Sequence, residues 1–136
     1  MRILAMYVGE CGTEWCRLGD GYVAGGVRLD SNAVWTLLQE ELDCGPGSEE
    51  EPIIAVIGGN VSADVRGDLS GWEVAKLGVE VELPHGHEVA ISNRAADRTI
   101  GKYADALRQQ GLLDADGPVR RAAAMALDAA ARRGYA

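Results

Sequence analysis

The hydrophobic pattern is clearest at the start of the chain, where three short apolar segments are separated by glycine-containing turns. Residues 3–8 are apolar at both odd and even positions, which is typical of a strand buried on both faces of a sheet. Segments 14–18 and 22–29 follow, after turns at 9–12 and 19–21. We therefore expect three consecutive antiparallel strands.

The next stretch of the chain changes from a helical to a strand pattern. Apolar residues recur at helical spacing over 34–42, and Asp30 or Ser31 stands where a helix cap is expected. After an acidic loop, residues 53–57 form a continuous apolar run. Such a continuous run predicts a central, parallel strand.

The remaining elements extend the alternation of helices and strands. A helix is predicted over about 69–77, and the strict alternation of residues 79–83 predicts a strand with one face toward solvent. A helix is expected from about 95 to 110, and Pro118 and Gly134 frame a last, alanine-rich helix. The order predicts an α/β fold with a five-stranded mixed sheet flanked by helices.

Length and hydrophobicity indicate a single domain. The chain has 136 residues, of which 47% are hydrophobic, enough for one sizeable core. We expect residues 1–110 to form the domain and residues 111–136 to be a helical extension packed on it. The longest apolar run is too short to cross a membrane, and the first residues lack the features of a signal peptide. We therefore expect a cytoplasmic protein that has no membrane partner.

Charge and cysteine content narrow the function classes. The net charge is −8, with a balance of −11 over residues 1–92 and +3 over residues 93–136, so a polyanion would prefer the C-terminal third. A domain this acidic is a poor general binder of nucleic acid. Cys11, Cys16 and Cys44 match no structural zinc pattern, and we expect three reduced thiols.

One motif, together with the order of elements, resembles the ribonuclease H-like superfamily. The motif is Gly86-His87, five further residues, Asn93, two residues, and Ala96-Asp97. Ribonucleases H of type I carry the same residues at the same spacing between the last strand and the next helix. The resemblance covers roughly residues 3–107, and it implies the ribonuclease H-like fold, in which three antiparallel strands precede the parallel ones.

The family's metal ligands are only partly matched. In the family, four carboxylates hold two magnesium ions at the scissile phosphate. Asp97 matches the fourth carboxylate, whereas the other three positions fall at Val8, Trp35 and Gly59. One carboxylate cannot hold two ions, so the resemblance implies a catalytically degenerate, non-enzymatic module that needs no cofactor and binds nucleic acid or protein.

Other residues of the motif have a functional and a structural interpretation. His87 resembles the loop histidine that the family uses in proton transfer, or it belongs to an exposed loop. Asn93 resembles a residue that contacts substrate, or it caps the following helix. Arg94 and Arg98 begin a basic stripe that contacts substrate or faces solvent, and the stripe continues through Lys102 and Arg108.

An active enzyme is the first alternative. In a metal-dependent ribonuclease H that cuts RNA–DNA hybrids, Glu10 and Asp64 or Asp68 would join Asp97 as relocated ligands of Mg²⁺ or Mn²⁺. Asp97, His87 and Glu10 would then be the catalytic residues. Surface carboxylates are common in so acidic a chain, which favours the degenerate module.

Two further alternatives depend on the helices. The alanine-rich last helix has small side chains that either cover the sheet or pair with a protein partner, which would make the chain an assembly subunit. Residues 93–103, followed by Leu112 and Leu113, are also similar to the recognition helix of a winged helix-turn-helix. That motif needs a helix just before the recognition helix, and the pattern predicts a strand and a loop there.

Overall fold

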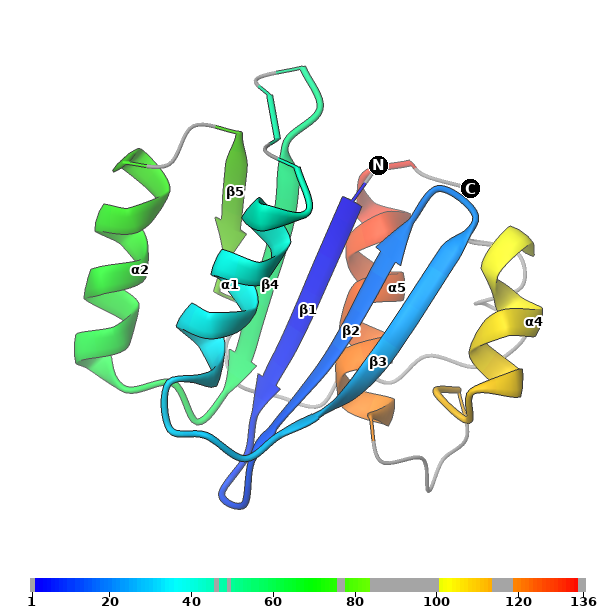
Figure 1. Ribbon diagram of the computed structural model, residues 1–136, viewed down its shortest axis with the longest axis horizontal. Coiled ribbons are helices and arrows are strands. Elements are labelled where there is room, and N and C mark those ends of the chain that lie inside the picture. The colour runs from blue at the N-terminus through cyan, green and yellow to red at the C-terminus, as the bar shows by residue number, and fades with distance from the viewer. Residues whose placement is uncertain are drawn as a thin grey trace.

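The computed structural model describes residues 2–45, 47–48, 50–75, 78–83, 101–113 and 119–134, with side chains except at 70–75 and 102. Within these residues, five strands form one sheet (Figure 1). Their bounds are β1 Arg2–Val8, β2 Thr13–Gly19, β3 Tyr22–Arg28, β4 Ile53–Gly59 and β5 Val79–Glu82.

The sheet is mixed, with the strand order β3-β2-β1-β4-β5. β1 pairs with β2 and β2 with β3 in antiparallel orientation, whereas β1 pairs with β4 and β4 with β5 in parallel. This arrangement confirms the predicted α/β class and the five-stranded mixed sheet. It also brings the carboxyl ends of β1 and β4 to the same edge, the lower one in Figure 1.

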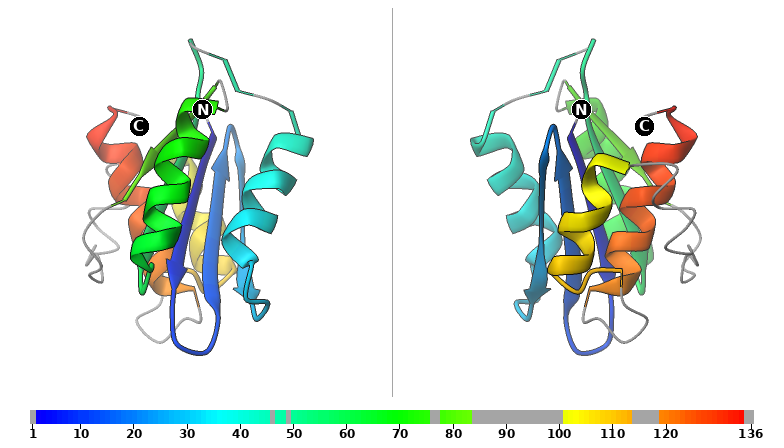
Figure 2. Two further views of the ribbon diagram at one scale, coloured as in Figure 1. Left: turned by 90° about the vertical axis from the view of Figure 1, so that its left-hand side faces the viewer. Right: turned by 90° about the vertical axis from the view of Figure 1, so that its right-hand side faces the viewer.

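Helices cover both faces of the sheet, so the molecule has three layers (Figure 2). Helices α1 (Ala33–Asp43) and α2 (Ala63–Ala75) lie on one face, and α4 (Gly101–Gln109) and α5 (Arg120–Arg132) lie on the other. In the part of the chain that the structure describes, no helix combines the length and apolar character that crossing a membrane requires.

Two hydrophobic cores explain why β1 is apolar at both odd and even positions after Arg2. Ile3 and Ala5 belong to the core beneath α4 and α5. Leu4 and Met6 point the other way, into the core beneath α1 and α2. Because successive side chains of a strand point to opposite faces, a strand covered on both faces needs an uninterrupted apolar run.

Two sequence predictions about helix starts were wrong. Helix α2 begins at Ala63 rather than near Leu69, and the hydroxyl of Ser62 accepts the Val65 N–H at 3.3 Å, which caps the helix. Its first turns are too polar for a hydrophobic period to reveal them. Helix α1 has Asn32, and neither Asp30 nor Ser31, at its cap position, and Asn32 makes no side-chain cap hydrogen bond; the Asp30 carboxylate accepts a hydrogen bond from Arg28.

Helix α5 covers the sheet, which was one of the two roles predicted for it. Its alanine face is buried, with Ala122, Ala126 and Ala129 each at 0% exposure. The helix contacts β1, β2 and β4 and shares the core that Ile3 and Ala5 enter. Small side chains allow the helix to approach the sheet closely. The predicted helix over 95–110 is described as α4 from Gly101, and residues 95–100 lie outside the described residues.

A buried carboxylate joins α1 to the sheet. Glu41 has a side-chain exposure of 2% and forms ion pairs with Arg2 of β1, at 2.9 Å, and with Arg17 of β2. The Arg2 guanidinium also donates to the carbonyl oxygen of Gly45, just after α1. Desolvation lowers the pKa of Arg17, but its hydrogen bond with Tyr22 and the charge of Glu41 outweigh this and raise that pKa above its usual value.

Replacing Glu41 should be strongly destabilising. In Glu41→Ala two arginines lose their shared partner, and breaking a buried ion pair costs about 3–5 kcal/mol of unfolding free energy. Urea unfolding followed by circular dichroism measures the change. The neighbouring Glu40→Ala is a matched control, since Glu40 pairs with Arg28 at the surface. Equal losses in the two variants would contradict the structural role of Glu41.

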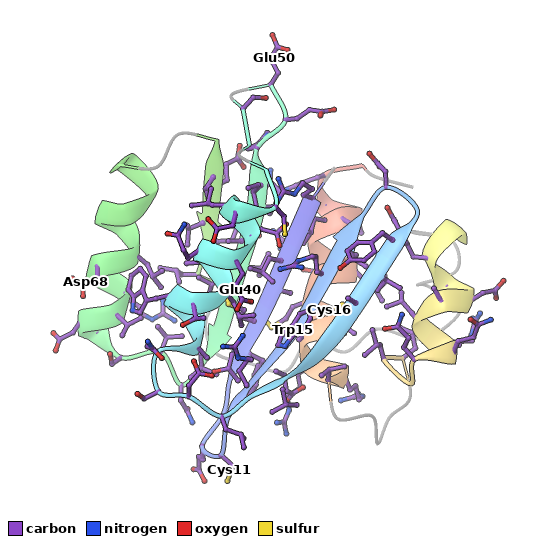
Figure 3. All side chains as sticks on the ribbon, in the orientation of Figure 1. Cys11, Trp15, Cys16, Glu40, Glu50 and Asp68 are labelled. Carbon is purple, nitrogen blue, oxygen red and sulfur yellow. The ribbon has the colours of Figure 1, made fainter. Side chains whose placement is uncertain are left out.

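The three thiols should differ in reactivity. Cys16 is fully buried, which raises the pKa of its thiol from 9.0 to about 12, whereas Cys11 and Cys44 are exposed (Figure 3). At pH 8 we expect Ellman's reagent to titrate Cys11 and Cys44 rapidly and Cys16 only after unfolding.

The same burial gives a pH dependence. The pKa of Cys16 is higher in the folded than in the unfolded chain, so this thiol stabilises the fold fully below about pH 9 and progressively less up to about pH 12. Rapid modification of Cys16 in the native protein would contradict both expectations.

Candidate functional site

The candidate site lies where the central parallel strands β1 and β4 end. Val8 and Gly59 are paired there in the strand register. In open α/β sheets, ligands bind outside the carboxyl ends of the parallel strands. The positions at which the ribonuclease H resemblance expects two of the metal ligands therefore meet at this edge.

The end of β4 is pressed against Val8. The Asn60 N–H donates to the Val8 carbonyl oxygen at 2.8 Å. Gly59 has φ of +87°, and a Cβ added there would lie 2.8 Å from the Val8 nitrogen. A side chain at position 59 is thus excluded both by backbone conformation and by space. No carboxylate can stand at this position without moving β1 or β4.

An apolar groove opens beside these two residues on the face covered by α1 and α2. Its volume is about 180 Å³.

Val8 of β1 and Trp35 of α1 both line this apolar groove. Its other lining residues are Thr13, Ser31, Val34, Asn60, Val61, Ser62 and Val65. The positions that the resemblance assigns to the first two carboxylates therefore converge, next to Gly59, which occupies the third. The described side chains there are apolar or neutral, and they do not fit a pair of magnesium ions, which require carboxylate oxygens.

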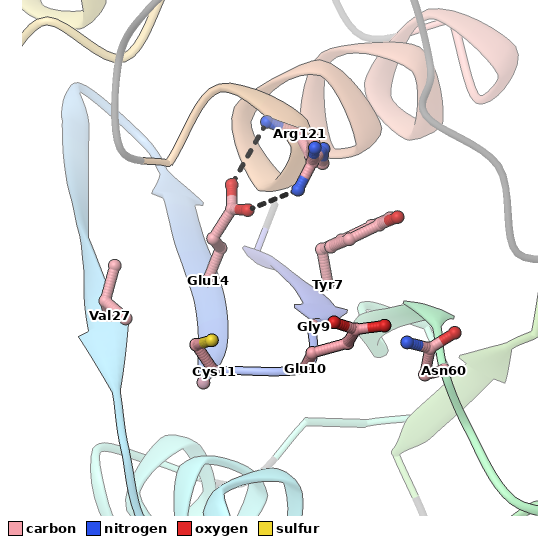
Figure 4. A pocket seen from close by; sticks show the side chains of 9 residues that line it. Tyr7, Gly9, Glu10, Cys11, Glu14, Val27, Asn60 and Arg121 are labelled. Atoms are coloured by element: carbon pink, nitrogen blue, oxygen red, sulfur yellow. Dashed lines mark hydrogen bonds and ion pairs between the residues drawn. The ribbon is translucent and has the colours of Figure 1, made fainter.

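A larger polar pocket, of about 500 Å³, lies at the same edge (Figure 4). Its lining residues are Tyr7, Gly9, Glu10, Cys11, Gly12, Glu14, Val27, Asn60 and Arg121. Asn60 lines the polar pocket and the apolar groove alike. Tyr7 packs against the core beneath α4 and α5, so the two cavities belong to opposite faces of the sheet.

Arg121 organises the inner wall of the polar pocket. Its backbone N–H and its Nη1 both donate to the Glu14 carboxylate, at 3.3 and 3.4 Å, and its guanidinium lies 4.9 Å from the centre of the Tyr7 ring. Helix α5 has no side-chain cap from Val119, so Glu14 satisfies an N–H of its first turn from another element. Sequence reasoning missed this group, because Glu14 and Arg121 are 107 residues apart.

Three of the predicted metal ligands are described: Glu10 in a turn, and Asp64 and Asp68 on α2, where Asp68 is exposed and lines neither cavity. Glu10 is exposed in the turn between β1 and β2 and lines the polar pocket. Asp64 is exposed in the first turn of α2 and does not line either cavity. Among described residues, no three His, Cys, Asp or Glu side chains are grouped to hold a metal ion.

The other predicted residues lie outside the described residues. These are His87, Asn93, Arg94, Asp97 and Arg98. A metal site that joins Asp97 to Glu10 and Asp64 therefore stays a prediction. Of the predicted basic stripe, Arg108 has a described side chain, and it forms an ion pair with Asp105 at 3.6 Å.

Comparisons with known proteins identify no relative. No protein-family model matches the chain, and no curated protein and no solved structure is significantly similar to it. The α/β architecture thus stands on the structure itself, while the ribonuclease H-like assignment stays a prediction carried by the motif and the order of elements.

The close contact between Gly59 and Val8 can be tested by a matched pair of variants. Gly59→Ala should lower the unfolding free energy by at least about 2 kcal/mol, because it combines a left-handed backbone with a collision. Gly67→Ala, in α2 with no atom within 4 Å of the added Cβ, should raise it by about 0.5–1 kcal/mol. Denaturant titration measures both values. A neutral Gly59→Ala would show that this end of β4 is free to move.

Proposed function

We propose that the chain is a ribonuclease H-like domain without hydrolytic activity that acts as a non-enzymatic binding module. The order of elements and the mixed strand pairing agree with the fold that the motif at 86–97 implies. The observation that carries the proposal is the convergence of Val8 and Trp35 beside Gly59. The positions come together as a metal site requires, but they bring no oxygen ligands.

Hydrolysis by the family mechanism would lack its metal site. Two magnesium ions stay about 4 Å apart only when carboxylate oxygens bridge and surround them. Val8 and Trp35 have no such oxygens, and Gly59 has no room for a side chain. Asp97 alone would leave both ions largely hydrated and free to diffuse away.

The described surroundings of the site favour a protein partner over nucleic acid. The apolar groove is large enough for one aliphatic side chain and is lined by Val34, Trp35 and Val65. Phosphate contacts depend mainly on Lys and Arg, and the nearby Arg121 is paired with Glu14. Nucleic acid would instead depend on the net positive C-terminal third.

Incubation with a labelled RNA–DNA hybrid and Mg²⁺ or Mn²⁺ tests the absence of catalysis. We expect the hybrid to stay intact with the wild-type chain and with Asp97→Asn, as measured on a denaturing gel. Cleavage by the wild type that Asp97→Asn abolishes would overturn the proposal and support an enzyme with relocated ligands.

The class of partner needs a separate measurement. Fluorescence anisotropy at low salt should show no saturable binding of the hybrid. Binding that is lost in Arg94→Ala and Arg98→Ala would favour the nucleic-acid form of the module. A stable oligomer in light scattering, without hybrid binding, would instead favour an assembly subunit.

A further inference from the structure

The polar pocket is a second candidate site, on the other face of the sheet from the apolar groove. Its volume of about 500 Å³ lies within the range of pockets that hold small ligands. Its walls come from β1, the turn at 9–12, β2, β3, the residue after β4, and α5 (Figure 4). The function proposed above makes no use of this pocket.

The positive charge of Arg121 inside the pocket is already neutralised by an ion pair. Arg121 pairs with Glu14, whose side chain is 16% exposed, and stacks on Tyr7. The Glu14 carboxylate also occupies the position at the start of α5 where a helix attracts an anion. A phosphate or carboxylate ligand would therefore have to displace Glu14.

The outer wall has the opposite character. Glu10 and Asn60 lie near each other at this wall (Figure 4), and the side chain of neither forms a hydrogen bond or ion pair with another described residue. A carboxylate and an amide oxygen both accept hydrogen bonds. The charged groups that line the pocket, Glu10, Glu14 and Arg121, leave one negative charge without a counterpart.

We infer that the polar pocket binds an organic cation through Glu10 and Asn60. The N–H groups of a guanidinium or ammonium donate to the Glu10 carboxylate, and the positive charge balances Glu10. The amide nitrogen of Asn60 is on the side of Glu10 in Figure 4, so its amide oxygen accepts from the cation after a half turn of the amide group. On the inner wall, the Arg121 guanidinium is likewise paired with a carboxylate, that of Glu14, and it also lies over the Tyr7 ring. The cation comes either from an arginine side chain or from a free polyamine.

Isothermal titration at low ionic strength tests the inference with two cations and one anion. N-acetyl-L-arginine amide represents the guanidinium source, spermidine the polyamine source, and inorganic phosphate the anion. We expect at least one cation to bind saturably and phosphate not to bind. Glu10→Gln should raise the dissociation constant about tenfold, because a charge-assisted hydrogen bond becomes neutral.

Asp68→Asn is the matched control, since it removes the same charge from an exposed position on α2 (Figure 3). We expect its dissociation constant to stay within about twofold of the wild type, and Asn60→Ala to weaken binding as a second, uncharged change. Failure of both cations to saturate, equal weakening by Glu10→Gln and Asp68→Asn, or saturable phosphate binding would each overturn the inference. The hybrid cleavage assay is independent of all these outcomes.

Discussion

The parallel pairing of β1 with β4 is the constraint on which the candidate site depends. Both strands are buried on both faces, so their relative position is fixed by two hydrophobic cores as well as by their hydrogen bonds. At their carboxyl ends, the Val8 carbonyl accepts the Asn60 N–H. This bond turns the chain toward α2 and places Asn60 between the apolar groove and the polar pocket. A glycine at position 59 is the condition for this close approach.

A second constraint fixes α1 against the same strands. Glu41 is buried between Arg2 and Arg17, which come from β1 and β2. Removing charges from water is costly, and the geometry of several partners around one carboxylate offsets that cost. The same helix contributes Trp35, near its start, to the groove that Val8 also lines. The apolar groove thus depends on hydrophobic packing and also on the ion pairs of Glu41, which lie outside the groove.

The sequence allowed the local part of this structure to be predicted. The strands were recognisable because apolar runs and glycine turns are short-range signals, and the predicted 53–57 differs from β4 only at its carboxyl end. The start of α2 was missed because Ser62 and the polar residues after it carry no hydrophobic period. The pair of Glu14 with Arg121 had no signal either, since only the packing of α5 on the sheet brings them together. The resemblance assigned Val8 and Trp35 to one site. It did not reveal the polar pocket, whose walls come from four elements and from the residues that follow β1 and β4.

The two cavities give one edge of the sheet two surfaces of different chemical character. Several carboxylates in one place repel each other unless a metal ion is bound, whereas Val8 and Trp35 bury apolar surface and stabilise the fold without any ligand. What remains at the edge is an apolar groove on one side of Asn60 and an acceptor-rich wall with Glu10 on the other. A partner that reaches both cavities would therefore present an aliphatic side chain and a cationic group to opposite sides of Asn60. That combination belongs to proteins with basic, apolar segments, and a phosphate backbone lacks both features.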